Sequence, residues 1–306
     1  MSEGPVYDSL VVGAGPAGLS AALQLARSNR QVAVVDGGSG RSTFRQVNHN
    51  YLGFPGGIAA QDLRRLGREQ VAAYPVAFID EDVASVRRRN SVFEAELYSR
   101  RRLKARTLVL ATGVTDNFPT VPDWQEYVGR SLFWCIVCDG YAARGKRVIA
   151  VGNHDEAAVT ALQFLQFTAT VSVLTNSPDC DMSPRLRRRL RDHGIPLMIG
   201  EISEFLGDDG ILGEVALADG TRLTADFVFS LQGGTPNNAL AKEVGAPLAK
   251  DGSVIVDEDQ KTKIPGLFAV GDLADGHAHQ IATAVHEGLT AATAAQHYLM
   301  HPWQRE

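Results

Sequence analysis

Two cysteines near the middle of the 306-residue chain have the spacing of a redox pair. Cys135 and Cys138 form a Cys-x-x-Cys motif, and the sequence holds only one other cysteine, Cys180. Because no second Cys-x-x-Cys pair occurs, a zinc ion would lack its usual four ligands. The spacing therefore predicts thiol–disulfide chemistry and no metal site.

The residues around this pair can activate it. A thiol attacks a disulfide only as its thiolate, and two cysteines three residues apart can begin a helical turn, where unpaired N–H groups favour a negative sulfur. Asp139 follows directly, and its carboxyl group can exchange protons with the thiols if burial raises its pKa. The alternative for Asp139 is a helix or turn cap. Cys180 lies between two aspartates that disfavour a thiolate, so we assign it no role.

A dinucleotide site is predicted at the beginning of the chain. An apolar strand over 7–12 leads into a glycine-rich turn, a helical segment over 19–27 and a second apolar strand over 32–35. In such a unit the glycines permit a tight turn, the approach of a pyrophosphate and close packing of the helix, while a terminal acid accepts from a ribose hydroxyl. The predicted contacts are Gly13, Gly15, Pro16, Ala17, Gly18 and Asp36.

Two later strand ends favour FAD over NAD as the ligand. Residues 106–110 form a strand that leads into Ala111-Thr112-Gly113, and residues 266–270 form one that leads into Gly271-Asp272. A carboxylate at a strand end suits the ribityl hydroxyls of a long flavin cofactor. Either segment alone is also typical of a strand-ending turn. Together with the N-terminal unit, they predict a flavin site.

With these motifs the sequence resembles the low-molecular-weight thioredoxin reductases over nearly its whole length. It resembles especially their divergent branch without NADPH-binding signatures, which includes deeply rooted and ferredoxin-type reductases and gliotoxin-type dithiol oxidases. The matching pieces occur in the expected order and are Gly13–Gly18, Asn48–Pro55, Ala111–Gly113, Cys135-Ile136-Val137-Cys138-Asp139-Gly140, Gly271-Asp272 and Gln280–Ala284.

The resemblance implies an α/β fold of two Rossmann-like dinucleotide-binding domains, each with three ββα layers, the second inserted into the first. Residues 1–114 and 236–306 would bind FAD, and residues 115–235 would form an NAD(P)H-binding-like domain that carries the cysteines. It also implies that Cys138 faces the flavin, Cys135 attacks the substrate disulfide and Asp139 is the acid–base group. Further flavin contacts that it implies are Asn50, Ala111, Thr112, Gly113, Gly271, Asp272, Gln280, Ile281 and Ala282.

The second nucleotide unit departs from the pattern. Strands are predicted over 146–151 and 171–174, but His154 stands where a second glycine should be, and Asp155 and Glu156 would repel a phosphate at the start of the helix. Residues 175–181 contain no cation, although an NADPH site usually offers arginine there. We predict that NADPH is not the physiological reductant.

Three functions remain open at this point. The first is an FAD-dependent thiol–disulfide oxidoreductase that acts on a thioredoxin-like protein or a small disulfide, with ferredoxin or flavodoxin as the electron donor. The second is a dithiol oxidase that passes electrons from a small molecule to oxygen. The third is a non-enzymatic flavin redox sensor. The resemblance also implies a homodimer.

Composition argues against other classes of protein. The net charge is −5 and the isoelectric point about 5.9, which does not favour a nucleic-acid partner. The basic run over 185–191 has leucines at i, i+4 spacing and is typical of the solvated side of an amphipathic helix. The N-terminal apolar run is too short to span a membrane, so a cytoplasmic location is the default expectation.

Three residues near the C-terminus leave alternatives. His277 and His279 either face the flavin edge or lie in a surface loop. Trp303 either covers the flavin or belongs to a disordered tail.

Overall fold

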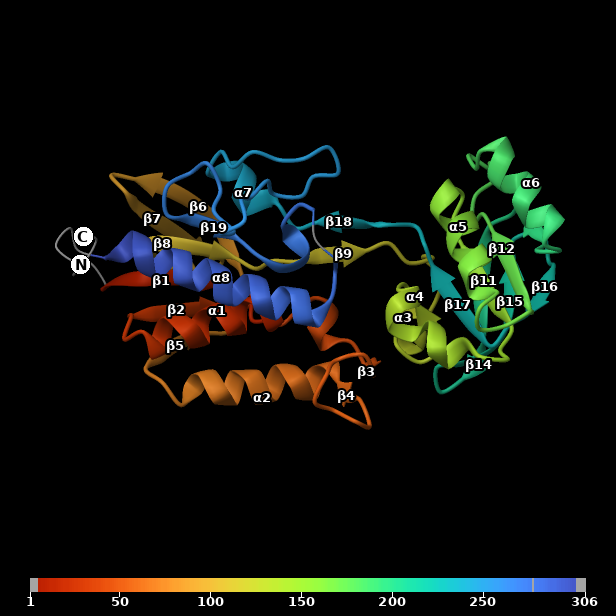
Figure 1. Ribbon diagram of the computed structural model, residues 1–306, viewed down its shortest axis with the longest axis horizontal. Helices are drawn as coiled ribbons and strands as arrows, with labels where there is room; N and C mark the ends of the chain where they lie inside the picture. The colour runs from red at the N-terminus through yellow and green to blue at the C-terminus, as the bar shows by residue number, and fades with distance from the viewer. Residues whose placement is uncertain (1–4, 277, 301–306) are drawn as a thin grey trace. The chain divides into compact units, whose positions relative to one another are not determined.

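The computed structural model describes residues 5–276 and 278–300, and these divide into two units (Figure 1). Unit 1 comprises the described parts of Met1–Thr43, Ala60–Thr115 and Thr235–Glu306; unit 2 comprises Phe44–Ala59 and Asp116–Gly234. Residues 44–59, which the expected division assigns to the first domain, thus belong to unit 2. At the boundaries near residues 115 and 235, β9 (Val114–Asp116) and β18 (Gly234–Pro236) pair with each other.

Unit 1 is built on a parallel sheet with strand order β5-β2-β1-β8 and with β19 on the far side of β8. An antiparallel meander, β6-β7, continues from the first half of β8. The strands are β1 (Val6–Val12), β2 (Val32–Val35), β5 (Val76–Ile79), β6 (Val83–Arg89), β7 (Val92–Leu97), β8 (Arg102–Leu110) and β19 (Leu267–Ala269). The helices are α1 (Pro16–Arg27), α2 (Ala60–Ala72), α7 (Ala239–Glu243) and α8 (Ile281–Leu299), with short 3₁₀ turns η1 (Arg41–Thr43) and η3 (Gly271–Leu273).

The two faces of this sheet bury different layers. Val11 on β1 packs in a core with alanines and leucines of α1 and alanines of α8, whereas its neighbours Leu10 and Val12 belong to a second core with β7 and α7. Side chains alternate along a strand, so an unbroken apolar run predicts a strand covered on both faces. The three-layer α/β architecture predicted from the sequence is confirmed.

Unit 2 repeats this arrangement. Its parallel sheet has the order β10-β17-β11-β12-β13, and a three-stranded antiparallel sheet has the order β14-β15-β16. The strands are β10 (Leu132–Phe133), β11 (Val148–Val151), β12 (Val171–Leu174), β13 (Leu197–Met198), β14 (Ile202–Asp208), β15 (Ile211–Leu217), β16 (Arg222–Thr224) and β17 (Phe227–Ser230), with a hairpin of β3 (Val47–Asn48) and β4 (Ile58–Ala59). The helices are α3 (Trp124–Tyr127), α4 (Ile136–Asp139), α5 (Asp155–Phe164) and α6 (Pro184–Asp192), with the 3₁₀ turn η2 (Gly140–Ala143).

One face of β11 packs against helices and the other against the antiparallel sheet. Val148 and Ala150 share a core with α5 and α6, and Ile149 and Val151 share one with β14 and β15. This is again a sandwich of sheet, sheet and helices. Across residues 5–276 and 278–300, the helices include none that is both long and apolar enough to cross a membrane.

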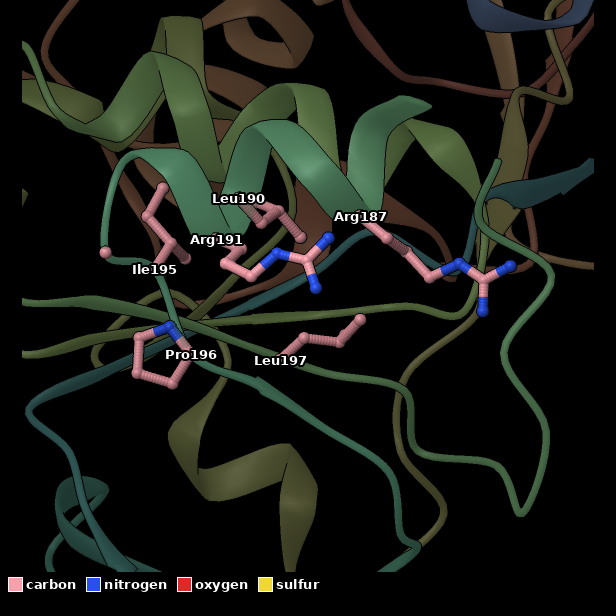
Figure 2. A pocket seen from close by; sticks show the side chains of 7 residues that line it. Arg187, Leu190, Arg191, Ile195, Pro196 and Leu197 are labelled. Atoms are coloured by element: carbon pink, nitrogen blue, oxygen red, sulfur yellow. The ribbon is translucent and has the colours of Figure 1, made fainter. Parts of the chain in front are cut away.

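The arginine-rich helix α6 is amphipathic, as its sequence predicts. Leu186 and Leu190 are buried and the arginines between them are exposed. Beside it lies a hollow of about 490 Å³, with α6 on one side and Pro196 and Leu197 on the other (Figure 2). Its lining contains neither a cysteine nor a predicted nucleotide contact, so the hollow is separate from the thiol site described below.

Candidate functional site

The cysteine pair lies at the start of a helical turn in unit 2. Cys135 is the N-cap of α4, and its sulfur accepts a hydrogen bond from the backbone N–H of Cys138 at 3.1 Å. The two sulfurs are joined in a disulfide, with the Cα atoms 5.3 Å apart. An N–H in this position can stabilise a thiolate on Cys135 once the disulfide is open. The geometry therefore favours Cys135 as the nucleophile.

Aromatic residues support the Cys135 side of the turn. Trp134 packs edge-on against Phe44 and Phe118, with ring centroids 5.8 and 5.7 Å away. Phe133 on β10 is buried in the core of unit 2. By contrast, Val137 between the cysteines is 74% exposed. The residues that precede the pair are thus held in aromatic packing, and Val137 between the two cysteines is open to solvent.

Asp139 is the acidic group nearest to the pair in sequence, and it is mostly buried. Burial raises the pKa of Asp139 to about 7 from its ordinary value of 3.8. An acid with a pKa near neutrality can both give and take a proton under physiological conditions. Its side chain makes no N-cap bond to the following turn η2, which disfavours the alternative role as a cap.

The glycine turn of unit 1 has the shape that a pyrophosphate needs. Gly13 has φ +103, and a Cβ on it would lie 2.3 Å from the carbonyl oxygen of Ala111. A Cβ on Gly18 would lie 1.9 Å from the oxygen of Gly13. Gly15 is different, because a Cβ there would meet only the Ser42 hydroxyl, at 4.0 Å. Two glycines serve packing, and the third leaves room in front of the first turn of α1.

The other predicted flavin segments of unit 1 converge on this turn. A Cβ on Gly271 would lie 3.0 Å from Cβ of Ala17, and a Cβ on Gly288 of α8 would lie 2.2 Å from the oxygen of Ala17. Gln280 is the N-cap residue of α8, and Ile281 and Ala282 are the first two residues of this helix. Thr112 and Gly113 are held by hydrogen bonds to Asn237. The start of α1, the η3 turn and α8 therefore meet in one place.

The carboxylates of this site are held by hydrogen bonds and ion pairs. Asp36 accepts from the backbone N–H of Ala14 at 3.0 Å and forms an ion pair with Arg64 of α2. Asp272 forms an ion pair with Arg41 of η1 at 2.6 Å. These residues fit FAD: the turn admits a pyrophosphate, and the two carboxylates can accept from ribose and ribityl hydroxyls.

Sequence reasoning missed several residues that shape this site. Glu287 on α8 is 1% exposed and accepts a hydrogen bond from the N–H of Gly271 at 2.5 Å, which supports the turn before Asp272. Arg41, Arg64 and Asn237 were also missed. The sequence signal for Glu287 is an acidic residue among the small and apolar residues of the last helix. The two arginines have no comparable signal.

Two further predicted residues are exposed in the structure. Asn50 is exposed in the 44–59 segment of unit 2. His279 is exposed in the loop between η3 and α8. His277 and Trp303 lie outside the described residues. No three His, Cys, Asp or Glu side chains within 5–276 and 278–300 are grouped to hold a metal ion.

A prediction follows from the different roles of the glycines. Gly18→Ala is expected to destabilise unit 1 by more than about 3 kcal/mol, because its methyl group overlaps the Gly13 carbonyl in a packed interior. Gly15→Ala is the matched control: the apoprotein should keep its melting temperature, while FAD affinity falls because the methyl group enters the pyrophosphate position. Thermal melts and FAD titrations of the two apoproteins check this. Equal melting temperatures would contradict it.

The start of α5 in unit 2 is organised differently from that of α1. His154, the N-cap, is exposed and its side chain makes no capping bond. The Asp155 carboxylate accepts from the backbone N–H of Ser183 at 2.6 Å, and the carbonyl of Asn153 accepts from the N–H of Asp181 at 2.9 Å. The loop that follows β12 is thus tied at two points to residues at and just before the start of α5.

The end of β12 is also committed to hydrogen bonds within the protein. The Asn176 side chain accepts from the N–H of Ile202 at 2.8 Å and donates to Gln232 at 2.9 Å. The Thr175 hydroxyl donates to the carbonyl of Ser177 at 2.7 Å. The polar side chains at the end of β12 are thus hydrogen-bonded within the protein.

Two nucleotide-binding folds and a redox disulfide define a flavin-dependent disulfide oxidoreductase. The chain belongs to the pyridine nucleotide-disulphide oxidoreductase family, whose sequence profile matches residues 7–288. It is therefore an FAD-binding enzyme of the thioredoxin reductase type.

Individual relatives agree over nearly the whole chain. The thioredoxin reductase of Bacillus subtilis is 27% identical over 308 residues, which cover 98% of this chain and 96% of that protein. The thioredoxin reductase of Streptococcus pyogenes superposes with a TM-score of 0.89 at 29% identity, covering 96% and 98% of the two chains. The structure of HlmI superposes with a TM-score of 0.88 at 29% identity, covering 98% and 94%.

Proposed function

We propose that this enzyme transfers electrons between FAD and a thioredoxin-like protein through Cys135 and Cys138, and that NADPH is not its electron donor. The start of α5 supports the proposal that NADPH is not the electron donor. Two exposed carboxylates, Asp155 and Glu156, stand in its first turn, and Asp155 binds the N–H of Ser183. A bound phosphate would have to occupy this same position at the helix N-terminus.

Electrostatics make such a position a poor phosphate site. Two like charges about 5 Å apart near a protein surface cost on the order of 1 kcal/mol or more. The 2′-phosphate of NADPH would also find no guanidinium in residues 175–181. The combined loss lowers affinity by several powers of ten, since each 1.4 kcal/mol is about tenfold. A one-electron protein donor such as ferredoxin or flavodoxin does not need this site.

The residues of the thiol site can carry out the reductase direction. When bound, FAD supplies the two-electron carrier. Two electrons delivered through the cofactor and two protons would open the Cys135–Cys138 disulfide to two thiols, and the Asp139 carboxylate would take the proton that leaves Cys135. The Cys135 thiolate, stabilised by the N–H of Cys138, attacks the substrate disulfide and releases one substrate thiolate, which takes a proton. Cys138 then attacks the mixed disulfide, restores the protein disulfide and releases the second thiol.

A protein substrate is favoured by the surface around the pair. Val137 and Tyr141 are 74% and 72% exposed, and the Arg144 guanidinium lies 5.1 Å from the centre of the Tyr141 ring. Exposed apolar and aromatic side chains beside a reactive disulfide are typical of a protein-docking surface. We further propose a homodimer, as in the resembling family.

The test is an anaerobic donor screen that follows flavin absorbance by stopped flow. NADPH and NADH at up to about a hundred micromolar should leave the flavin oxidised over seconds. Dithiothreitol, acting through Cys135 and Cys138, should bleach the flavin and so prove that the flavin of this preparation can be reduced through the cysteine pair. Reduced ferredoxin or flavodoxin should bleach it as well.

The other outcomes discriminate among the remaining functions. Rapid bleaching by micromolar NADPH would refute the proposed donor. Turnover with a small dithiol and oxygen, without reduction of a thioredoxin-like protein, would identify a dithiol oxidase. Reduction by none of these donors would leave a redox sensor.

A further inference from the structure

Each of the two carboxylates expected to contact FAD is paired with an arginine that no cofactor motif includes. Asp36 is paired with Arg64, and their side chains are 9% and 21% exposed. Asp272 is paired with Arg41, and both side chains are 20% exposed. Arg65, the next residue on α2, is 56% exposed and forms surface pairs with Asp62 and Glu69. Mostly buried pairs are unlike such surface pairs, because solvent screens them much less.

Both arginines come from the segment that follows β2, and this segment lies beside the glycine turn. The Ser42 hydroxyl of η1 is the nearest atom to the open side of Gly15, at 4.0 Å from a Cβ placed there. The side-chain amide of Gln61 on α2 donates to the carbonyl of Thr43 at 2.7 Å, which links α2 to η1. Arg41 and Arg64 are therefore held by one connected structure.

The pairing with arginines lowers the negative charge at the cofactor site. The pyrophosphate of FAD carries about two negative charges, and unpaired Asp36 and Asp272 would add two more. The arginines neutralise these two carboxylates. Each also holds one carboxylate oxygen, as the N–H of Ala14 holds the other oxygen of Asp36. The remaining lone pairs then point in a set direction, since an ionised carboxylate can accept about four hydrogen bonds.

We propose that Arg41 and Arg64 are positioning residues that set FAD affinity, Arg41 through Asp272 and Arg64 through Asp36. The role of the two arginines concerns FAD binding alone and does not depend on the electron donor or the substrate. FAD affinity therefore tests it separately from the donor screen.

The test compares FAD dissociation constants of apoproteins by quenching of flavin fluorescence. Arg64→Met and Arg41→Met keep the apolar stem and remove the charge, and each should weaken FAD binding by about tenfold. Arg65→Met is the matched control on α2 and should change the dissociation constant by less than about twofold. Dissociation constants within twofold of wild type for both Arg41→Met and Arg64→Met would overturn the proposal.

A double-mutant cycle separates positioning from general damage to the fold. In an Asp36→Asn background, Arg64→Met should lose most of its effect on FAD affinity, because there is no carboxylate left to hold. A full tenfold effect in that background would show that Arg64 does not act through Asp36. If Arg64→Met apoprotein fails to fold, Arg64→Lys keeps the charge but loses the forked geometry and should weaken binding by a smaller factor. Wild-type FAD affinity in both the Arg64→Lys and the Asp36→Asn single variants would also overturn the role.

Discussion

Cys135→Ser is expected to lower disulfide turnover by more than about a thousandfold while the protein still binds FAD. Serine cannot form the mixed disulfide with the substrate, and the hydrogen bond from the N–H of Cys138 then stabilises no thiolate. The measurement is the rate at which the disulfide of a thioredoxin-like protein is reduced when reduced ferredoxin or flavodoxin, and not dithiothreitol, supplies the electrons. Cys180→Ser is the matched control, because Cys180 is the free cysteine of the described chain and takes no part in the disulfide; it should keep its activity.

Cys138→Ser tests the order in which the two sulfurs act. In this variant Cys135 can still attack the substrate, but no second thiol resolves the product, so a covalent mixed disulfide with the substrate protein should accumulate. Non-reducing electrophoresis detects it. If the mixed disulfide instead accumulates in Cys135→Ser, the two sulfurs have the opposite roles.

Asp139→Asn is expected to lower turnover by about a hundredfold or more and to remove a limb near pH 7 from the pH–rate profile. The reason is that burial raises the pKa of Asp139 to about 7, so that the group stores a proton below that pH and loses it above. The measurement is turnover from pH 5 to 9. Asp179→Asn, at an exposed position in the same unit, is the control and should keep the wild-type profile. An unchanged limb in Asp139→Asn would assign it to another group.

The same carboxyl group makes stability depend on pH. Below about pH 4 it is protonated in both the folded and the unfolded chain. Because the folded pKa of Asp139 is raised to about 7, the unfolded chain loses this proton first as pH rises from 4 to 7, and folding stability falls by at most about 4 kcal/mol. Asp139→Asn should therefore be more stable than wild type above pH 7 and show little gain near pH 4. Urea denaturation at the two pH values measures the difference.

The sequence predicted the parts of this protein that depend on local pattern. Apolar runs such as 7–12 predicted strands buried on both faces, and Gly13 and Gly18 were recognised because their spacing reflects packing that no other residue permits. The Cys-x-x-Cys spacing predicted the turn that now holds the disulfide. The raised pKa of Asp139 was expected only on the condition of burial, which the structure meets.

Residues that act through long-range contacts could not be found in this way. Arg41 and Asp272 are 231 positions apart, and Asn237 meets Thr112 across 125 positions. An arginine in a loop or on a helix surface has the same local appearance whether its partner is water or a buried carboxylate. The grouping of residues 44–59 with unit 2 is likewise a matter of tertiary packing, and the strand pattern around it contains no sign of it.

The tie between Asp155 and Ser183 has a consequence for how cofactor preference can change. Removing the carboxylate to admit a pyrophosphate also removes the acceptor for the N–H of Ser183 and leaves the Asn153–Asp181 contact as the other tie of the loop after β12. Under the proposed function, a gain of nicotinamide use would have to replace the Asp155 carboxylate together with the contact that it makes to Ser183. A single replacement at Asp155 would then loosen this loop without providing a complete nucleotide site, which would disfavour a change of electron donor by single mutations.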